Sequence, residues 1–134
     1  MKHEMVLGLD HINVTAMPGE YENVRWFYGT VLGLREIVRS YPLPESGPLW
    51  FTLGNGIELH VDFDGVPHNH NSTRHVALRV RSLEAVTEAL RSNGFDIATD
   101  GATRTGACRC FCRDPFGNRL EFVEGAAVPS EAAS

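Results

Sequence analysis

The sequence has no run of eighteen apolar residues, so it offers no segment that could cross a membrane as a helix. Basic residues are also scarce, with 12 Lys and Arg against 17 Asp and Glu and a net charge of -5. Because a nucleic-acid surface needs concentrated positive charge, this balance argues against a nucleic-acid partner. The first five residues lack the apolar core of a signal peptide, and we therefore expect a cytoplasmic protein.

Cysteine is rare as well, with three residues in the chain. Cys108, Cys110 and Cys112 alternate along one predicted strand and are too far apart for an unstrained disulfide. Three ligands on one rigid strand cannot enclose a metal ion alone, so we expect reduced, packed thiols. Without a disulfide framework, a chain of 134 residues with 43% hydrophobic residues is still large enough to fold as one domain around an ordinary core.

The sequence does contain a pattern of secondary structure that occurs twice. Each copy begins with an alternating strand, continues with an amphipathic helix and ends with three more strands. For the first copy, residues 7–63, we predict strands at 9–14, 35–40, 49–53 and 57–63 and a helix over 24–31 that ends at Gly33. For the second copy, residues 74–124, we predict strands at 74–80, 95–99, 108–113 and 119–123 and a helix from Ser82 to Asn93. A polar linker, 64–73, joins the copies, and a flexible tail, 125–134, follows them.

The predicted fold is therefore α+β, with two β-α-β-β-β modules whose sheets curve into one cup. His11 and His75 occur in the first strands of the two copies, and Glu58 and Glu121 occur in the last strands. The two histidines are 64 residues apart and the two glutamates 63, as expected for equivalent positions of a repeat. Apolar residues alternate with these four along each strand. We expect the apolar residues to face the helices and the four polar side chains to project together from the opposite face.

Two imidazoles and two carboxylates on one face suit a divalent metal ion, which could be Ni, Zn, Mn, Co or Fe(II). We expect His11, Glu58, His75 and Glu121 to be its ligands. His60 follows Glu58 by two residues and shares its face, so it is an alternative ligand or an outer partner of the metal. Two histidines and one carboxylate are also typical of Fe(II) oxygenases, and the residues alone leave these choices open.

Four segments of this chain, LDHINV, GIELHV, RHVALRV and DPFGNRLEFVE, carry a resemblance that covers roughly residues 7–124. With the two modules, they resemble the vicinal oxygen chelate superfamily, which includes glyoxalase I, methylmalonyl-CoA epimerase, extradiol dioxygenases, and fosfomycin- and bleomycin-resistance proteins. The resemblance implies a metal cleft, built within one chain or across a homodimer. In bacterial glyoxalase I the ligands are His, Glu, His and Glu, at positions that match His11, Glu58, His75 and Glu121 here.

The resemblance also implies a reaction on a small-molecule substrate. An enzyme of the glyoxalase type, a lyase or isomerase, would act on a vicinal-oxygen or alpha-carbonyl compound through an enediolate-type intermediate, with Glu121 or Glu58 as the base. An extradiol-type dioxygenase is one alternative. The other is a metal-free protein of the bleomycin-resistance type that sequesters a drug or other ligand. For substrate binding the candidates are Arg109, which could reach an anionic group, and the aromatic residues Trp50 and Phe111.

Overall fold

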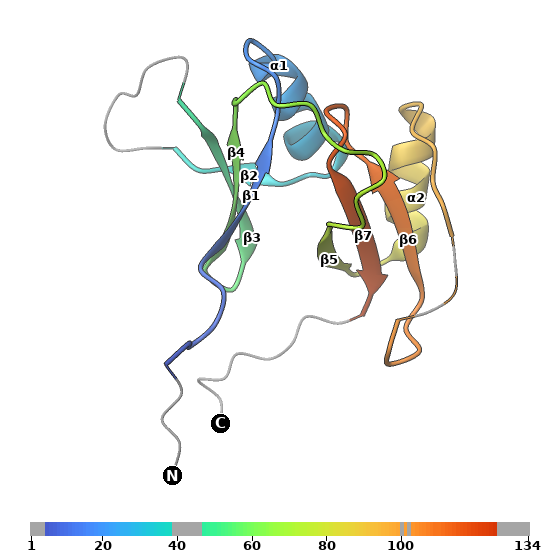
Figure 1. Cartoon of the computed structure of the whole chain (residues 1–134). Helices are drawn as coiled ribbons and strands as arrows, with labels where there is room; N and C mark the ends of the chain where they lie inside the picture. The colour runs from blue at the N-terminus through green and yellow to red at the C-terminus, as the bar shows by residue number, and fades with distance from the viewer. Residues whose placement is uncertain (1–4, 39–46, 100, 102, 126–134) are drawn as a thin grey trace.

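The computed structural model of the protein describes residues 5–38, 47–99, 101 and 103–125 (Figure 1). Its elements in chain order are β1 (His11–Thr15), α1 (Tyr21–Val24), the π-helix η1 (Arg25–Val31), β2 (Arg35–Glu36), β3 (Leu49–Gly54), β4 (Ile57–Asp62), β5 (Val76–Val80), α2 (Leu83–Ser92), β6 (Arg109–Arg113) and β7 (Arg119–Glu124). Within these ranges, no helix has both the length and the apolar character needed to span a membrane.

The strands of one chain form two separate sheets. The first sheet has the order β1-β4-β3-β2 and the second has the order β5-β7-β6. In both sheets the opening strand pairs in parallel with the last strand of the same half, and the remaining pairs are antiparallel. The α+β class predicted from the sequence is confirmed, with two mixed sheets and few helices.

The core follows from the alternation of apolar residues along the strands. Phe51, Leu59 and Val61 of the first sheet and Leu120 and Phe122 of the second are almost completely buried. They belong to one cluster, which also contains Phe27 and Tyr28 of η1 and Leu90 of α2. Because each sheet places its apolar face against helices in this way, the opposite face of each sheet is left for polar side chains.

Three predicted elements differ most from the observed ones. The strand expected at 95–99 is wrong, because the second half has only an isolated bridge there, between Ala98 and Phe111. The helix expected over 24–31 begins at Tyr21 and continues as a π-helix, and it ends before Gly33, whose φ of 75° is left-handed. The strand expected at 35–40 is observed only at Arg35–Glu36, and residues 39 and 40 lie outside the described part.

Other predictions have different outcomes: the helix cap is confirmed, and packed thiols are confirmed for two of the three cysteines. Ser82 caps α2, since its Oγ accepts a hydrogen bond from the backbone N–H of Ala85 at 3.1 Å. All three cysteines are free, and Cys110 and Cys112 are buried as predicted. Cys108 was also predicted to be packed, but it is exposed. Except for Gly125, the tail predicted at 125–134 lies outside the described residues.

A buried carboxylate joins the two halves of the chain. Asp114, which follows β6, accepts hydrogen bonds from the Tyr28 hydroxyl at 2.5 Å and from the Asn118 side-chain amide at 2.7 Å. The same amide nitrogen of Asn118 also lies 2.9 Å from the carbonyl oxygen of Thr15, at the end of β1. These contacts connect η1 and β1 of the first half with the turn between β6 and β7, so they link the two halves of the chain directly.

Candidate functional site

In the second sheet the structure brings together one predicted histidine and one predicted glutamate. The Nε2 atom of His75 lies 3.1 Å from Oε1 of Glu121. Glu121 is on the central strand β7 and is 5% exposed, although its side chain belongs to the face opposite α2. A buried carboxylate requires a compensating partner, and the imidazole is its nearest one in this sheet.

The hydrogen-bond partners of His75 are compatible with either of its two neutral tautomers. Its Nδ1 atom lies 2.8 Å from the carbonyl oxygen of Thr73 and 3.2 Å from a guanidinium nitrogen of Arg119. If Nδ1 carries the proton and donates it to Thr73, Nε2 presents a lone pair beside the carboxylate of Glu121, and a cation between the two atoms would satisfy both. In the other neutral tautomer, Nε2 donates to Glu121 and Nδ1 accepts from Arg119.

In the first sheet a second cluster occupies the polar face. His60 Nε2 lies 2.9 Å from Oε1 of Glu58, and the His60 ring stacks between the rings of His11, at 4.1 Å, and Trp50, at 5.0 Å. The Nδ1 atom of His11 lies 2.8 Å from a carboxylate oxygen of Asp10. Trp50, a predicted substrate-binding residue, therefore lies on the polar face.

Glu58 and His60 remain the two alternative ligands from β4, because they are in direct contact. The strand register adds one observation. Glu58 is opposite His11 in the first sheet, but Glu121 is opposite Ala77, two residues beyond His75. Two residues beyond His11, Asn13 pairs with His60, just as Ala77 pairs with Glu121 two residues beyond His75. The strand register therefore matches His60 with Glu121, whereas the order of residues along the chain matches Glu58 with Glu121.

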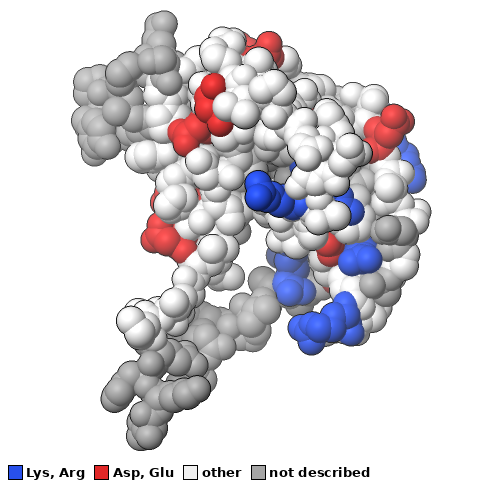
Figure 2. Space-filling model, in the orientation of Figure 1, with Lys and Arg blue, Asp and Glu red and all other residues white. Residues whose placement is uncertain are grey.

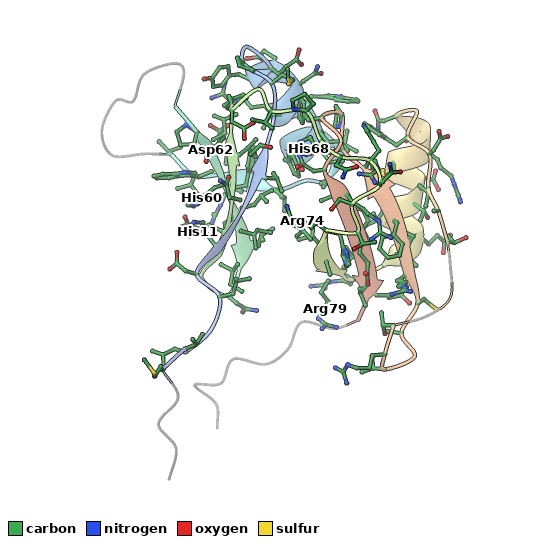
Figure 3. All side chains as sticks on the ribbon, in the orientation of Figure 1. His11, His60, Asp62, His68, Arg74 and Arg79 are labelled. Atoms are coloured by element: carbon green, nitrogen blue, oxygen red, sulfur yellow. The ribbon has the colours of Figure 1, made fainter. Side chains whose placement is uncertain are left out.

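A single chain does not join the two clusters. No group of three or more His, Cys, Asp or Glu residues that could hold a metal ion is found in the described part of the chain. Figure 3 shows the reason: His11 and His60 project from the first sheet on the side away from the second sheet. His11, Glu58, His75 and Glu121 therefore do not converge within one protomer, and neither does the set of His11, His75 and Glu121.

The chemistry of the donors nevertheless fits a divalent ion. Two donors that each lie about 2.1 Å from one ion, at an angle of roughly 90–109°, are about 3.0–3.4 Å apart. The separation of 3.1 Å between His75 Nε2 and Glu121 Oε1 falls in this range. The pair in the second sheet is thus half of the predicted donor set, whereas in the first sheet the imidazole in contact with Glu58 is that of the alternative ligand His60.

Arginines surround the pair in the second sheet. Arg119 lies over the ring of Phe111, with its guanidinium carbon 4.0 Å from the ring centroid, and a nitrogen of Arg109 lies 3.9 Å from Oε1 of Glu121. Arg109 and Phe111, both predicted to contact substrate, therefore lie beside Glu121. Arg119 was missed by the sequence reasoning, although its position two residues before Glu121 indicates the same face.

The surface charge differs between the two sheets. In Figure 2, Lys and Arg side chains gather around a hollow beside β5, β6 and β7, whereas the charged side chains that show over the first sheet are Asp and Glu. A groove of about 480 Å³ lies between the edge strands β1 and β5, and its lining includes His75, Arg74 and Arg119. The His75–Glu121 pair is thus bordered by a solvent-accessible groove and by positive charge.

Comparison with known proteins agrees with the fold. The Glyoxalase/Bleomycin resistance protein/Dioxygenase superfamily model matches residues 8–122. A solved structure from Bacillus anthracis, of a protein assigned to the glyoxalase family, is 31% identical, with a TM-score of 0.75 over 93% of this chain and 100% of that chain. A comparison with curated protein sequences finds no significant match.

The genomically encoded fosfomycin resistance protein FosX from Listeria monocytogenes shares the fold at 18% identity. Its TM-score is 0.73 over 91% of this chain and 94% of that one. Another FosX structure, in complex with Mn(II) and sulfate, is also 18% identical, with a TM-score of 0.71 over 91% of this chain and 93% of that chain. From the family match over most of its length, the chain belongs to the glyoxalase/bleomycin resistance protein/dioxygenase superfamily.

Proposed function

We propose that this protein is a metal-dependent enzyme of the glyoxalase type, acting on a small substrate with vicinal oxygens or an alpha-carbonyl group. The observation that carries the proposal is the contact of 3.1 Å between His75 and the buried carboxylate of Glu121. A carboxylate used only for solubility would lie in water. The FosX complex with Mn(II) supports a divalent ion as the cofactor.

We propose further that the complete site forms between two copies of the chain. The first-sheet cluster of one protomer, with His11 and either Glu58 or His60, would face His75 and Glu121 of its partner. Complementary charge supports this pairing, because the polar face of the first sheet carries Glu58 and Asp62 and the second sheet presents arginines. The two faces that a single chain leaves uncovered thus match each other.

The residues of the site have separate tasks in this proposal. A bound divalent ion would supply positive charge to stabilise negative charge on the substrate oxygens. Glu121 is the candidate that accepts the proton next to the substrate carbonyl, and Glu58 is the second candidate. His75 holds the Glu121 carboxylate in place, and Phe111, which packs against the His75 ring at 5.7 Å, limits the positions that this imidazole can take.

Elemental analysis of protein purified without a histidine tag tests this function. We expect about one equivalent of a divalent ion per chain, which chelators remove and which Mn, Ni, Zn or Co restores, together with activity on small alpha-carbonyl compounds. Bound Fe(II) that survives only anaerobic purification, with activity on catechols, would instead indicate the dioxygenase. Protein that neither contains nor binds any of these ions would contradict a metalloenzyme and leave ligand sequestration as the function.

A further inference from the structure

The second sheet carries a row of residues next to Glu121 that the proposed reaction does not use. In the strand register, Val123 of β7 is opposite Arg79 of β5 on one side and opposite Arg109 of β6 on the other. Arg79, Val123 and Arg109 therefore form a row across all three strands, here called the arginine row. It lies on the same face as Glu121, one step of two residues further along β7.

Two other arginines of this face, Arg113 and Arg119, hold neighbouring parts of the site in place. Arg113 donates hydrogen bonds to the carbonyl oxygens of Gly117 at 2.8 Å and of His70 at 2.9 Å, so its guanidinium holds the linker and the turn in place. Arg119 contacts the Thr73 carbonyl and His75 and stacks on Phe111. These two arginines are committed to the structure of the site.

Arg79 has no comparable task. It is exposed, it has no ion pair with any carboxylate among the described residues, and its guanidinium lies close to the backbone of Gly125. Figure 3 shows it at the border of the second sheet, on the side opposite α2. A guanidinium nitrogen of Arg109 lies 3.9 Å from Oε1 of Glu121, and its guanidinium carbon lies 5.2 Å from the centroid of the Phe111 ring. Among the described residues, Glu121 is the one acidic side chain between the arginine row and His75 on this face. The face thus has more guanidinium groups than carboxylates.

We propose that the arginine row binds an anionic group of the substrate, a carboxylate or a phosphate-like group. Guanidinium groups on both sides of a small apolar residue form an opening in which planar or tetrahedral oxyanions can accept several charge-assisted hydrogen bonds. This inference rests on the proposed function, because it takes the His75–Glu121 pair as the reacting end of the site. It adds the chemical class of the substrate.

The register also limits the size of the substrate. Val123 is two residues from Glu121, a distance of about 7 Å along an extended strand. A substrate whose anionic group contacts the arginine row while its reacting carbon lies beside Glu121 therefore has only a few bonds between the two groups. The structure thus assigns to this site a short, negatively charged compound, and it disfavours a neutral one of the same length.

Anion binding to chelator-treated protein tests the proposal separately from metal-dependent catalysis. Isothermal titration with inorganic phosphate, with acetate and with neutral acetamide is expected to show binding of at least one of the two anions and none of the amide. In Arg79→Gln and Arg109→Gln, binding should weaken by about tenfold or more, the loss expected when a charge-assisted hydrogen bond is removed. The tighter of the two anions distinguishes a tetrahedral from a planar group.

Arg91→Gln is the matched control, because it makes the same change of charge on the exposed surface of α2. It should bind the anions within about twofold of wild type, a difference too small for a direct contact. Circular dichroism verifies that each variant is folded, and the exposed Arg79 keeps the test valid if Arg109→Gln is unstable. The proposal is overturned if neither anion binds, or if Arg79→Gln binds them as tightly as wild type does. If the wild-type protein binds the anions but binds no divalent ion, the proposed function is contradicted and the anion-binding proposal is not.

Discussion

A heterodimer of a His11→Ala chain and a Glu121→Gln chain is expected to bind about half as much metal per chain as wild type, although each variant alone binds almost none. Removing one ligand should weaken the affinity for the ion by at least about 100-fold, since even changes outside the coordinating residues cost 10–100-fold. The partial recovery follows from the symmetry of a dimer with two equivalent sites. One site receives both defects and the other receives none.

This outcome depends on where the two clusters lie. His11 projects from the first sheet, away from the second, and Glu121 is buried in the second sheet. If each site combined both sheets of a single chain, every site in the mixed dimer would carry one defect and no metal would be recovered. Recovery therefore reports directly on a site shared between protomers.

The matched control pairs Glu121→Gln with His75→Ala, two changes in the same sheet. Each site of that heterodimer carries one defect whatever the arrangement, so it should bind almost no metal. The heterodimers are isolated with two different tags that contain no histidine, and metal is measured after desalting. A mixed His11→Ala and Glu121→Gln dimer as empty as this control would refute the shared site.

The second large effect concerns stability. Asp114→Ala is expected to lower the free energy of unfolding by about 3–5 kcal/mol, because it leaves several buried donors without a partner. Besides Tyr28 and the Asn118 side chain, the carboxylate accepts hydrogen bonds from the backbone N–H groups of Phe116 at 2.9 Å and Asn118 at 2.8 Å. Urea denaturation followed by tryptophan fluorescence measures the change.

Two variants show whether burial is the cause. Asp64→Ala removes a carboxylate that also accepts from a backbone N–H, that of Val66 at 3.0 Å, but this aspartate is exposed and its loss should cost less than about 1 kcal/mol. Tyr28→Phe leaves the other donors satisfied and should cost about 1–3 kcal/mol. Equal costs for Asp114→Ala and Asp64→Ala would show that the junction contributes little.

The pH dependence of the same site has a defined sign. Burial raises the pKa of Asp114 above its ordinary value of 3.8, although hydrogen bonds from Tyr28 and Asn118 oppose the shift. A carboxyl group whose pKa is raised in the folded state stabilises the fold below its unfolded pKa, and this contribution is lost as the pH rises through the folded pKa. Asp114→Asn does not titrate. The loss in free energy of unfolding that Asp114→Asn causes should therefore be larger near pH 3.5 than at pH 7. A larger loss at pH 7 would contradict the raised pKa.

Much of the site could be predicted because strand alternation is a local property. The placement of His60 beside Glu58, and of Arg109 and Phe111 beside Glu121, follows from residues spaced by two along a strand. The strand expected at 95–99 failed for the same local reason: a short apolar segment predicts extended backbone but not how many partners it will find. Likewise, nothing in the residues that neighbour Asp114 in the sequence indicated that its carboxylate would be buried and would accept a hydrogen bond from Tyr28, far away in the chain.

The sequence by itself determined the superfamily, the α+β class and the face of each strand on which a candidate ligand lies, because these depend on patterns within a few residues. Only the tertiary structure decided that the first-sheet cluster points away from the second sheet and so lies apart from the His75–Glu121 pair within one chain. That outcome depends on how η1 and the Asp114 turn pack between two sheets distant in sequence, and packing of this kind leaves no periodic signal in the chain.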